Sequence, residues 1–454
     1  MILIRNVKII DGSGSPAYPG DVLISGGKIS AIGHFPNRKA ETIIEGLGAY
    51  LTPGFIDIQS EADHYLKIFT NPSQNQYLAE GITTIIGGHS GASLAPLLYG
   101  SLRTLHEYTN PNQINVNWHS FEELVKELNK LPLGVNFGSF IGHSTIRQEL
   151  NDDENRDLTD PEINVFKRII REALEQGAFG LSTGPDTARG RRVPQHEIRE
   201  LLSEAADKNG IYSVRLRNNK DDLVNTINEI IFLYQNSGVK TIINNFQPLA
   251  GFDKQYQLAL QLIEKNGDGI FFTVSPELSR TVTARQLLPE WAQAENLEEM
   301  DQKRIINQIK IPDEVIIEEL PSAYRYLQGK TLKEFAKNRK LPLGQALLEL
   351  IRMTKMRLVV SLTDVSEKLL SDWLTHDRAL ITAPVNKFFE IAENQRWPLE
   401  KAVAKLTSFP ARVLGLKNRG LIKENFAADL VLIKDKKIQT VLVNGNSGGE
   451  AVVL

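Results

Sequence analysis

Hydrophobic and polar residues alternate at both ends of the chain, in short runs that stop at glycine-rich turns. Alternation with a period of two predicts half-buried strands. Because chain termini often lie close together, both ends are expected to build one small β domain from residues 1–53 plus 410–454. The runs are Ile2–Val7, Gly20–Ile24, Lys28–Gly33, Glu41–Ile44, Asp429–Ile433 and Ile438–Val443.

The middle of the chain has a different pattern, in which short apolar strands alternate with amphipathic helices such as Asp160–Gln176 and Pro194–Asn209. Eight strand–helix repeats in this length predict an α/β fold, a (β/α)8 TIM barrel over residues 54–409. The interval before the eighth strand is too long for one connection, so we expect a mainly helical insertion around residues 285–356. The expected strands are Gly54–Gln59, Ile82–Gly87, Val135–Gly142, Ala178–Thr183, Ile211–Arg217, Lys240–Gln247, Ile270–Ser275 and Ala379–Ala383.

Composition narrows the classes of function. The 454 residues carry a formal net charge of -3, which argues against a nucleic-acid partner held by a strong basic field. No apolar run approaches the ~18 residues of a membrane span, and the first residues lack the features of a signal peptide, so a cytoplasmic location is expected. The absence of cysteine excludes disulfides, zinc–cysteine sites and a cysteine nucleophile.

Polar residues stand where the predicted strands end. Barrel enzymes place their working residues at the C-terminal ends of strands, so the candidate site is expected there. The strand ends read Asp57–Glu61, Gly88–Gly91, Gly142–Arg147, Ser182–Gly184, Arg215–Arg217, Asn244–Gln247 and Thr382–Pro384.

Several segments resemble a known family. Leu51–Asp57 resembles the first barrel strand of the amidohydrolase superfamily. The resemblance to one branch, the N-acyl-D-amino-acid deacylases (D-aminoacylases), implies a barrel with a composite β-sandwich domain built from both termini. It also implies zinc-dependent hydrolysis of the amide C–N bond of N-acyl-D-amino acids. The segments that resemble this branch are Gly81–Thr84, Gly91–Pro96, Gly177–Gly184, Leu406–Arg412, Arg419–Gly420 and Ala428–Val431.

The positions that correspond to the family's metal ligands differ. Zinc binds histidine nitrogen, thiolate or carboxylate, and of the replacements only Glu61 is a good ligand. Arg215 is a permanent cation and cannot coordinate a metal. The comparison therefore predicts no metal and no other cofactor, and the loss of the hydrolytic centre. Gln59 and Glu61 replace a His-x-His pair, Ser90 a cysteine, Arg215 and Asn245 two histidines, and Ala383 (or Thr382) an aspartate.

Further candidate residues lie outside the positions matched to metal ligands or suggest other uses of them. His143 and Arg147 resemble a Gly-His-x-x-x-Arg segment of the family and are expected near the barrel mouth, as is Arg217. Glu61 and Arg215 are expected to form an ion pair. A rearranged metal site remains an alternative, made by Glu61, Asp63, His64 and His89. An arginine cluster could bind a carboxylate or phosphate, and Lys387 is a weak substitute for the arginine that holds the family's substrate carboxylate. The cluster is Arg189, Arg191 and Arg192.

Three functions from different classes follow. The first is a catalytically inactive homologue whose pocket, lined by the candidates named above, binds a partner or a small ligand, with a carboxylate-bearing molecule as one option. The second is an active hydrolase of non-peptide C–N bonds with an altered or metal-free site that uses Glu61, His89 or His143. The third is an interaction subunit that pairs with an active relative. No membrane partner is expected, and a homo-oligomer remains open.

Overall fold

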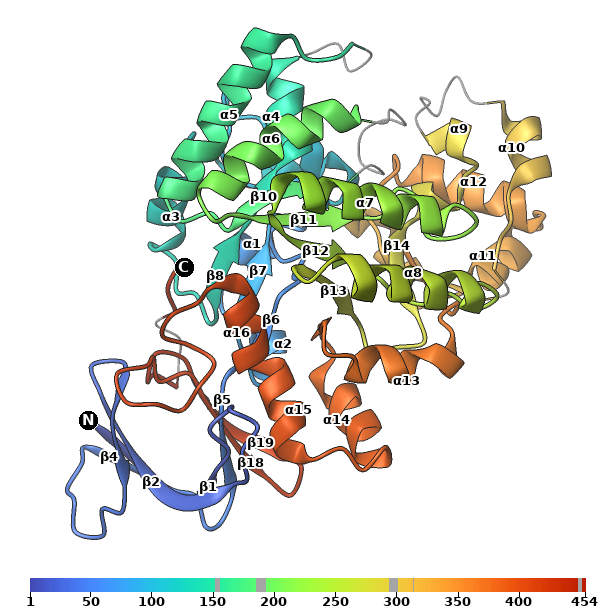
Figure 1. Ribbon diagram of the computed structural model, residues 1–454. Helices are drawn as coiled ribbons and strands as arrows, with labels where there is room; N and C mark the ends of the chain where they lie inside the picture. The colour runs from blue at the N-terminus through green and yellow to red at the C-terminus, as the bar shows by residue number, and fades with distance from the viewer. Residues whose placement is uncertain (152–155, 185–192, 294–300, 313, 448–450) are drawn as a thin grey trace.

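A computed structural model describes residues 1–151, 156–184, 193–293, 301–312, 314–447 and 451–454. Figure 1 shows three parts: a sheet made from both ends of the chain, a central set of parallel strands ringed by helices, and a lobe formed by the later residues of the chain. No helix in these described ranges is long and apolar enough to cross a membrane.

The two ends of the chain form one seven-stranded sheet, in the order β19-β18-β5-β1-β2-β3 with β4 paired to β1. Isoleucine, valine and leucine from alternate positions form its small core. Hydrogen bonds join all seven strands into a single sheet, which differs from the two sheets of the expected sandwich. The strands are β1 (Ile2–Ile9), β2 (Tyr18–Ser25), β3 (Lys28–Gly33), β4 (Thr42–Glu45), β5 (Tyr50–Pro53), β18 (Leu430–Lys434) and β19 (Lys437–Leu442).

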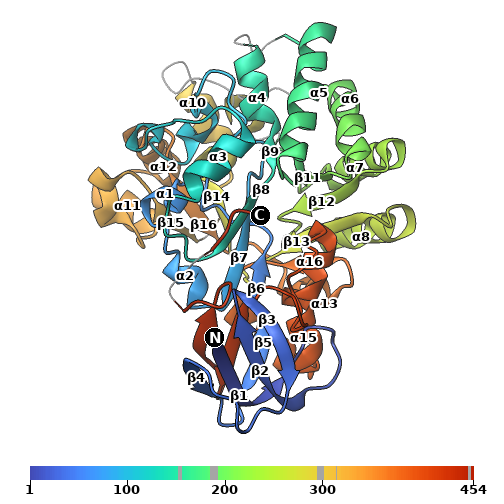
Figure 2. The ribbon, with the colours of Figure 1, turned by 90° about the vertical axis from the view of Figure 1, so that its left-hand side faces the viewer.

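Each of the eight strands expected in the middle of the chain is present. They run parallel in two sheets, β6-β7-β8 and β9-β10-β11-β12-β13-β17, and the break between these sheets falls at Phe140. Figure 2 shows β6, β7 and β8 side by side above the terminal sheet. The strands are β6 (Phe55–Asp57), β7 (Ile82–Gly87), β8 (Asn136–Ser139), β9 (Ile141–Gly142), β10 (Gly180–Thr183), β11 (Ile211–Arg215), β12 (Lys240–Asn244), β13 (Ile270–Val274) and β17 (Ala379–Ile381).

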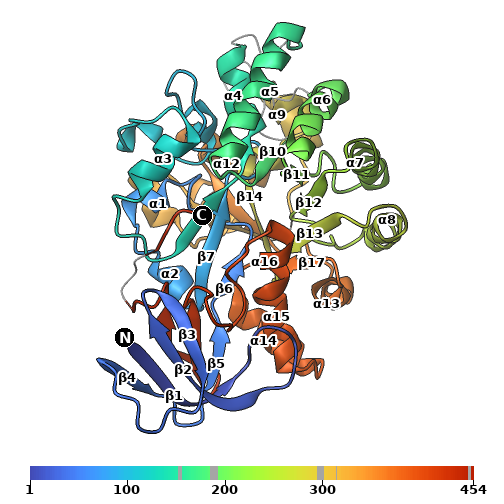
Figure 3. The ribbon, with the colours of Figure 1, turned by 60° about the vertical axis from the view of Figure 1, so that its left-hand side comes forward.

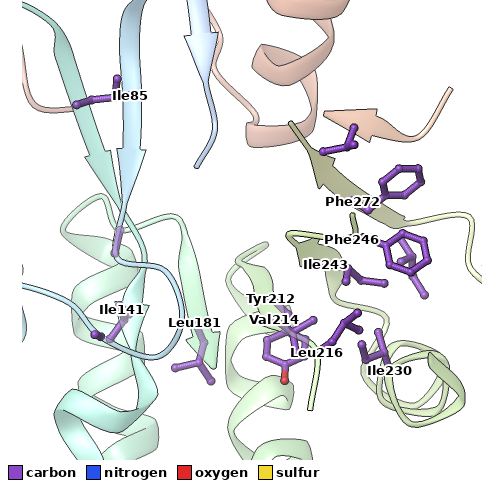
Figure 4. Close-up of a cluster of buried hydrophobic side chains, with 14 of the residues drawn as sticks. Ile85, Ile141, Leu181, Tyr212, Val214, Leu216, Ile230, Ile243, Phe246 and Phe272 are labelled. Carbon is purple, nitrogen blue, oxygen red and sulfur yellow. The ribbon is translucent and has the colours of Figure 1, made fainter. Parts of the chain in front are cut away.

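Amphipathic helices cover the outside of these strands, and Figure 3 shows α7 and α8 almost end-on beside β11 to β13. Leu216 after β11 and Ile230 of α7 belong to the same large core (Figure 4). The helices are α1 (Lys67–Thr70), α2 (Asn75–Leu78), α3 (Phe121–Leu128), α4 (His143–Leu150), α5 (Asp160–Glu175), α6 (Gln195–Asp207), α7 (Leu223–Ser237), α8 (Asp253–Asn266), α13 (Glu367–Thr375), α14 (Val385–Asn394), α15 (Leu399–Leu406) and α16 (Ser408–Leu414).

The limits of the two predicted domains stay predictions. Helix α16 spans the expected limit at residue 410, and its Ala411 and Leu414 share a buried cluster with Ile56 of β6. The last residues return to the parallel strands, where Val453 bridges Phe137 of β8.

The long segment before β17 is less helical than expected. It contains an antiparallel sheet, β14-β16-β15, formed by β14 (Arg280–Thr283), β15 (Val315–Glu319) and β16 (Val359–Leu362). We call this sheet and its helices the insertion lobe; it has a hydrophobic core of its own. The prediction missed the sheet because β15 is short and isolated in sequence from its partner, β16. The helices are α9 (Glu290–Gln293), α10 (Gln302–Gln308), α11 (Leu332–Arg339) and α12 (Leu343–Met353).

Candidate functional site

A cavity of about 680 Å³ lies between the C-terminal ends of the parallel strands and the insertion lobe. Its size falls within the usual range of small-molecule pockets, roughly 300–1,000 Å³. Six of the ten candidate residues line it: Gln59, Glu61, Arg215, Arg217, Asn245 and Ala383. His89, Ser90, His143 and Arg147 are buried outside it.

Gln59 and Asn245 belong to a closed set of hydrogen bonds that we call the amide ring. The Gln59 side-chain amide donates to Asn245 Oδ1 at 2.7 Å, and Gln59 Oε1 accepts from the Thr273 hydroxyl. The backbone N–H of Asn245 donates to Thr273 Oγ1 at 2.8 Å. The ring joins the ends of β6, β12 and β13 with neutral groups, and both side-chain amide oxygens already accept a hydrogen bond.

His89 is held by protein groups on both ring nitrogens. Nε2 lies 2.8 Å from the carbonyl oxygen of Ile58, so it carries the proton and donates. Nδ1 therefore accepts, from the Ser213 hydroxyl at 2.9 Å, and Asn244 Nδ2 donates to that hydroxyl at 2.7 Å. Burial lowers the pKa of His89 to about 4. His89 is thus a neutral structural residue and does not line the cavity, contrary to expectation.

His143 and Arg147 were also expected near the mouth, and the structure buries them elsewhere. Both contact the carboxylate of Glu197, His143 through Nε2 at 2.8 Å and Arg147 through Nε at 3.1 Å. Burial raises the pKa of Glu197, but the hydrogen bond from His143 and the nearby charges outweigh it, so the net shift is downward. This triad anchors α6 to α4 because a buried carboxylate needs compensating donors.

The expected ion pair between Glu61 and Arg215 is not formed. Among the described residues, no ion pair within 4.0 Å joins these two side chains; an Arg215 guanidinium nitrogen instead donates to Gln286 Oε1 at 3.2 Å. Gln286 belongs to the short 3-10 helix Ala284–Leu287, so Arg215 links β11 to the insertion lobe. Arg217 reaches Glu229 of α7 at 3.2 Å and the carbonyl oxygen of Val193 at 2.8 Å.

The residues present do not fit a catalytic zinc ion. In the described part of the chain, no group of three or more histidine, cysteine, aspartate or glutamate side chains is placed to hold a metal. Asp63 and His64 are fully buried away from the cavity, Asp63 accepting from the backbone of Gly88 and His64 stacking on Tyr108. The positions that the resemblance matches to metal ligands hold the hydrogen-bonded amides of Gln59 and Asn245, the cation Arg215 and a single carboxylate in the cavity wall, Glu61.

Asp57 is a cavity residue that the sequence prediction missed. It is 4% exposed, and its carboxylate accepts from the backbone N–H of Gln59 at 3.0 Å. Burial raises the pKa of Asp57 to about 7, against the opposing effect of backbone hydrogen bonds. Its place in the Leu51–Asp57 segment at a strand end was a signal that could have identified it.

The sequence also gave little sign of the charged residues that the insertion lobe brings to the cavity, among them Lys310, Glu318 and Glu319. Lys387 is exposed and lies 4.0 Å from Glu277. The predicted cluster of Arg189, Arg191 and Arg192 lies outside the described residues.

The chain is similar in sequence to known proteins. The model of the amidohydrolase family matches residues 363–448. An N-acyl-D-aspartate deacylase of Alcaligenes xylosoxydans xylosoxydans is 26% identical over 445 residues, which cover 95% of this chain and 85% of the relative. A D-aminoacylase of the same organism is 26% identical over 447 residues, 95% and 87% of the two chains. These matches support a place for the chain in the amidohydrolase superfamily.

Within that superfamily they support the D-aminoacylase branch, since both relatives match over 95% of this chain. The solved structures agree on the fold. An N-acyl-D-glutamate deacylase from Bordetella bronchiseptica, complexed with zinc and a phosphonate inhibitor, superposes with a TM-score of 0.82 at 21% identity. The match covers 100% of this chain and 99% of the other. A D-aminoacylase mutant in complex with copper chloride gives a TM-score of 0.81 at 22% identity, covering 100% and 97%.

Proposed function

We propose that this protein is a D-aminoacylase relative, built on a (β/α)8 barrel, that has no zinc centre and binds a small ligand in the cavity. The observation that carries the proposal is the amide ring of Gln59, Asn245 and Thr273. It stands where the resemblance places metal-binding histidines.

The chemistry of the family depends on those positions. A bound zinc ion lowers the pKa of water to about 7 and so supplies the nucleophile. A catalytic zinc site usually takes three protein ligands from imidazole, thiolate and carboxylate groups. Here the amide oxygens of the ring already accept hydrogen bonds, and breaking the ring to free them would leave the Thr273 hydroxyl and the Gln59 amide N–H without their acceptors. Arg215 would also place a permanent positive charge beside the metal.

The first test makes two measurements on the same preparation of the full-length protein. Elemental analysis measures metal content, and a turnover assay uses a panel of N-acyl-D-amino acids with and without added zinc. We expect no stoichiometric metal and no turnover above a heat-inactivated control. Stoichiometric zinc together with turnover would refute the proposal.

A matched pair of variants sharpens this test. Gln59→His/Asn245→His places two imidazoles at the ring, and we expect its zinc affinity to rise well above that of the unmodified protein. Gln59→Leu/Asn245→Leu breaks the same hydrogen bonds without adding ligands and should show no such rise. Equal zinc binding by the unmodified protein and the histidine variant would contradict the argument.

A metal-free hydrolase is a second candidate, which Asp57 favours. Its carboxyl lies in the cavity wall, and a pKa near 7 suits a general base at neutral pH. The test is a search for C–N bond hydrolysis that resists chelators and disappears in Asp57→Asn. Activity of equal size in that variant would exclude Asp57 as the base.

Three further points stay predictions from the sequence. They are the pairing with an active relative, the formation of a homo-oligomer and the cytoplasmic location. The absence of a metal forms part of the present proposal and is tested with it, whereas a carboxylate-bearing ligand stays a prediction as well.

A further inference from the structure

The charged residues of the cavity wall divide into paired and unpaired groups. Lys67 lies 2.7 Å from Glu319, and the guanidinium of Arg280 makes two contacts of 2.8 Å with Asp364. These pairs neutralise one another within the wall.

Four charged residues of the wall have neither an ion pair within 4.0 Å nor a side-chain hydrogen bond to any residue in the described ranges. Two are cations and two are carboxylates. Paired charges satisfy each other, whereas unpaired charges that face a shared cavity are available to a ligand. The four are Lys220, Lys310, Glu61 and Glu318.

The register of the insertion sheet places the two cations at one end of the cavity. Arg280 of β14 and Val315 of β15 both pair with Leu362 of β16. Lys310 precedes Val315 in the chain. Burial, the largest cause, and the charges of Arg280 and Lys310 lower the pKa of Lys220, while the nearby carboxylates of Asp364 and Asp221 raise it. We call this the basic end.

The carboxylates lie towards the other end of the same sheet. Glu319 pairs with Val359, the far end of β16, and Glu318 precedes it. Burial, the largest cause, and then the charges of Glu61 and Glu319 raise the pKa of Tyr65. The Lys67 ammonium lies 5.0 Å from the centre of the same ring. The charge of Arg215 lowers the pKa of the same phenol, so this end also contains cations. Its three carboxylates, those of Glu61, Glu318 and Glu319, still outnumber the two cations. We call it the acidic end.

The separation of the ends sets the length of a ligand that touches both. From Val315 to Glu319 the strand rises by roughly 13 Å, at about 3.3 Å per residue. A single amino acid carries its ammonium and carboxylate on one carbon atom and cannot reach both ends. A peptide of about four residues can, since an extended chain spans at most ~3.3–3.6 Å per residue.

A second observation points to a ligand with N–H groups. Asn244, at the end of β12, is 1% exposed and lines the cavity, and its Oδ1 atom has no hydrogen-bond partner among the described residues. Its amide nitrogen is already used by Ser213. A buried carbonyl oxygen without a donor carries a desolvation cost that a ligand N–H would offset.

From this arrangement we infer that the cavity binds a short peptide with both ends free, its ammonium group at Glu61 and Glu318 and its carboxylate at Lys220 and Lys310. The inference rests on the proposed ligand binding in this cavity and names the class of ligand. It differs from an N-acyl-D-amino acid, which has no free amine for the acidic end.

Calorimetric titration of the full-length protein tests this with three forms of one probe, tetra-alanine, in its D and L series. The forms are free at both ends, N-acetylated, and C-terminally amidated. We expect the free form to bind, N-acetylation to weaken binding about tenfold and amidation about threefold. The difference follows because Glu318 and Glu61 are less exposed than the two lysines, and charge pairs strengthen with burial.

Two double variants assign the ends. Glu61→Gln/Glu318→Gln should remove the preference for a free amine and leave the affinity for the N-acetylated form unchanged. Lys220→Gln/Lys310→Gln should remove the preference for a free carboxylate. Glu390→Gln and Lys401→Gln are the controls, because both residues are exposed and lie outside the cavity.

The outcomes separate this inference from the proposed function. Equal or tighter binding of the N-acetylated form, or no binding of any tetra-alanine, overturns the peptide inference. A preference for the free form that persists in both double variants overturns the assignment of the ends. Metal content and deacylase turnover are measured on the same samples, and they alone decide whether the zinc centre is absent.

Discussion

The cavity has a floor, formed by the ends of the parallel strands, and a wall, formed by the insertion lobe and its neighbours. The two differ in how far their polar groups are satisfied within the protein. At the floor, the ends of β6, β12 and β13 meet through neutral groups such as Gln59 and Asn245, and His89 supports this floor from outside the cavity through its hydrogen bond to Ile58. Nearly all of the hydrogen-bonding capacity of these groups is used within the protein. On the wall, the insertion lobe and its neighbours present charges such as Lys310 and Glu318, which have no partner in the part of the chain that the structure describes. A satisfied floor gives stability, whereas an unsatisfied wall gives capacity for binding.

Asp57 is the charged exception in the floor, and replacing it should have the largest effect. Its folded pKa of about 7 lies well above the ordinary aspartate pKa of 3.8, so between these pH values the folded protein holds a proton that the unfolded chain releases. The stability of the unmodified protein therefore falls as pH rises from about 4 to about 7. Asp57→Asn removes this loss, so its stability relative to the unmodified protein should rise over that window by up to about 4 kcal/mol.

Urea unfolding at a series of pH values measures this difference. The matched control is Asp268→Asn, because the Asp268 side chain is fully exposed and should show no such trend. A relative stability of Asp57→Asn that is flat from pH 4 to pH 8 would mean that Asp57 is ionised in the folded protein like an ordinary carboxyl.

His89→Leu tests whether the floor owes its stability to hydrogen bonds. The substitution leaves the Ile58 carbonyl and the Ser213 hydroxyl without one partner each, so we expect a loss of about 2–4 kcal/mol. Thermal and urea denaturation at pH 8 measure it. His196→Leu, at an exposed position of α6, should stay within about 0.5 kcal/mol of the unmodified protein.

The pH profile gives a second reading of the same residue. The pKa of His89 is lowered from 6.5 to about 4 in the folded protein. Between these pH values the imidazole is protonated in the unfolded chain and neutral in the folded protein. The unmodified protein therefore loses stability from this residue as pH falls from about 6.5 to 4. That loss should be missing in His89→Leu.

The parallel strands could be predicted because their signal is local. Segments such as Ile82–Gly87 are short, continuous and apolar, and they alternate with helices whose limits are marked by Pro161 and Gly177. The six positions matched to metal ligands could be identified only by resemblance, because each side chain taken alone is an ordinary residue of a strand end.

Contacts between distant segments could not be predicted. His143 stands at a strand end, but its partner Glu197 lies 54 residues away on another helix and draws the ring into the core. The charges of the wall depend on β15, whose pairing with β16 has no counterpart in local sequence pattern. The direction of each side chain at the mouth was therefore beyond the sequence alone.

Gln59→Leu breaks the amide ring at one member and should cost about 1–2 kcal/mol, less than His89→Leu because Gln59 is partly accessible to water. Water can then satisfy part of what Asn245 and Thr273 lose. Equilibrium unfolding in urea measures the change, with the exposed Gln395→Leu as the control. A double cycle with Asn245→Leu should show a coupling energy of about 1 kcal/mol; additive effects would mean that the ring does not act as a unit.

Glu318→Gln should have the smallest effect and the opposite sign. Burial, followed by the charges of Glu277 and Glu319, raises the pKa of Glu318, so its ionisation costs stability. Removing the charge should therefore stabilise the protein by a few tenths of a kcal/mol above about pH 5, less at high salt and not at all below about pH 4. Asp364→Asn, which leaves Arg280 without its carboxylate, is the contrasting control and should destabilise. Because Glu318→Gln is expected to keep the fold intact, a weaker preference for a free amine in this variant reports on recognition and not on unfolding.

A destabilised Glu318→Gln would show that this carboxylate already makes a favourable interaction within the protein. The charged wall would then be satisfied by the protein itself, as the floor is.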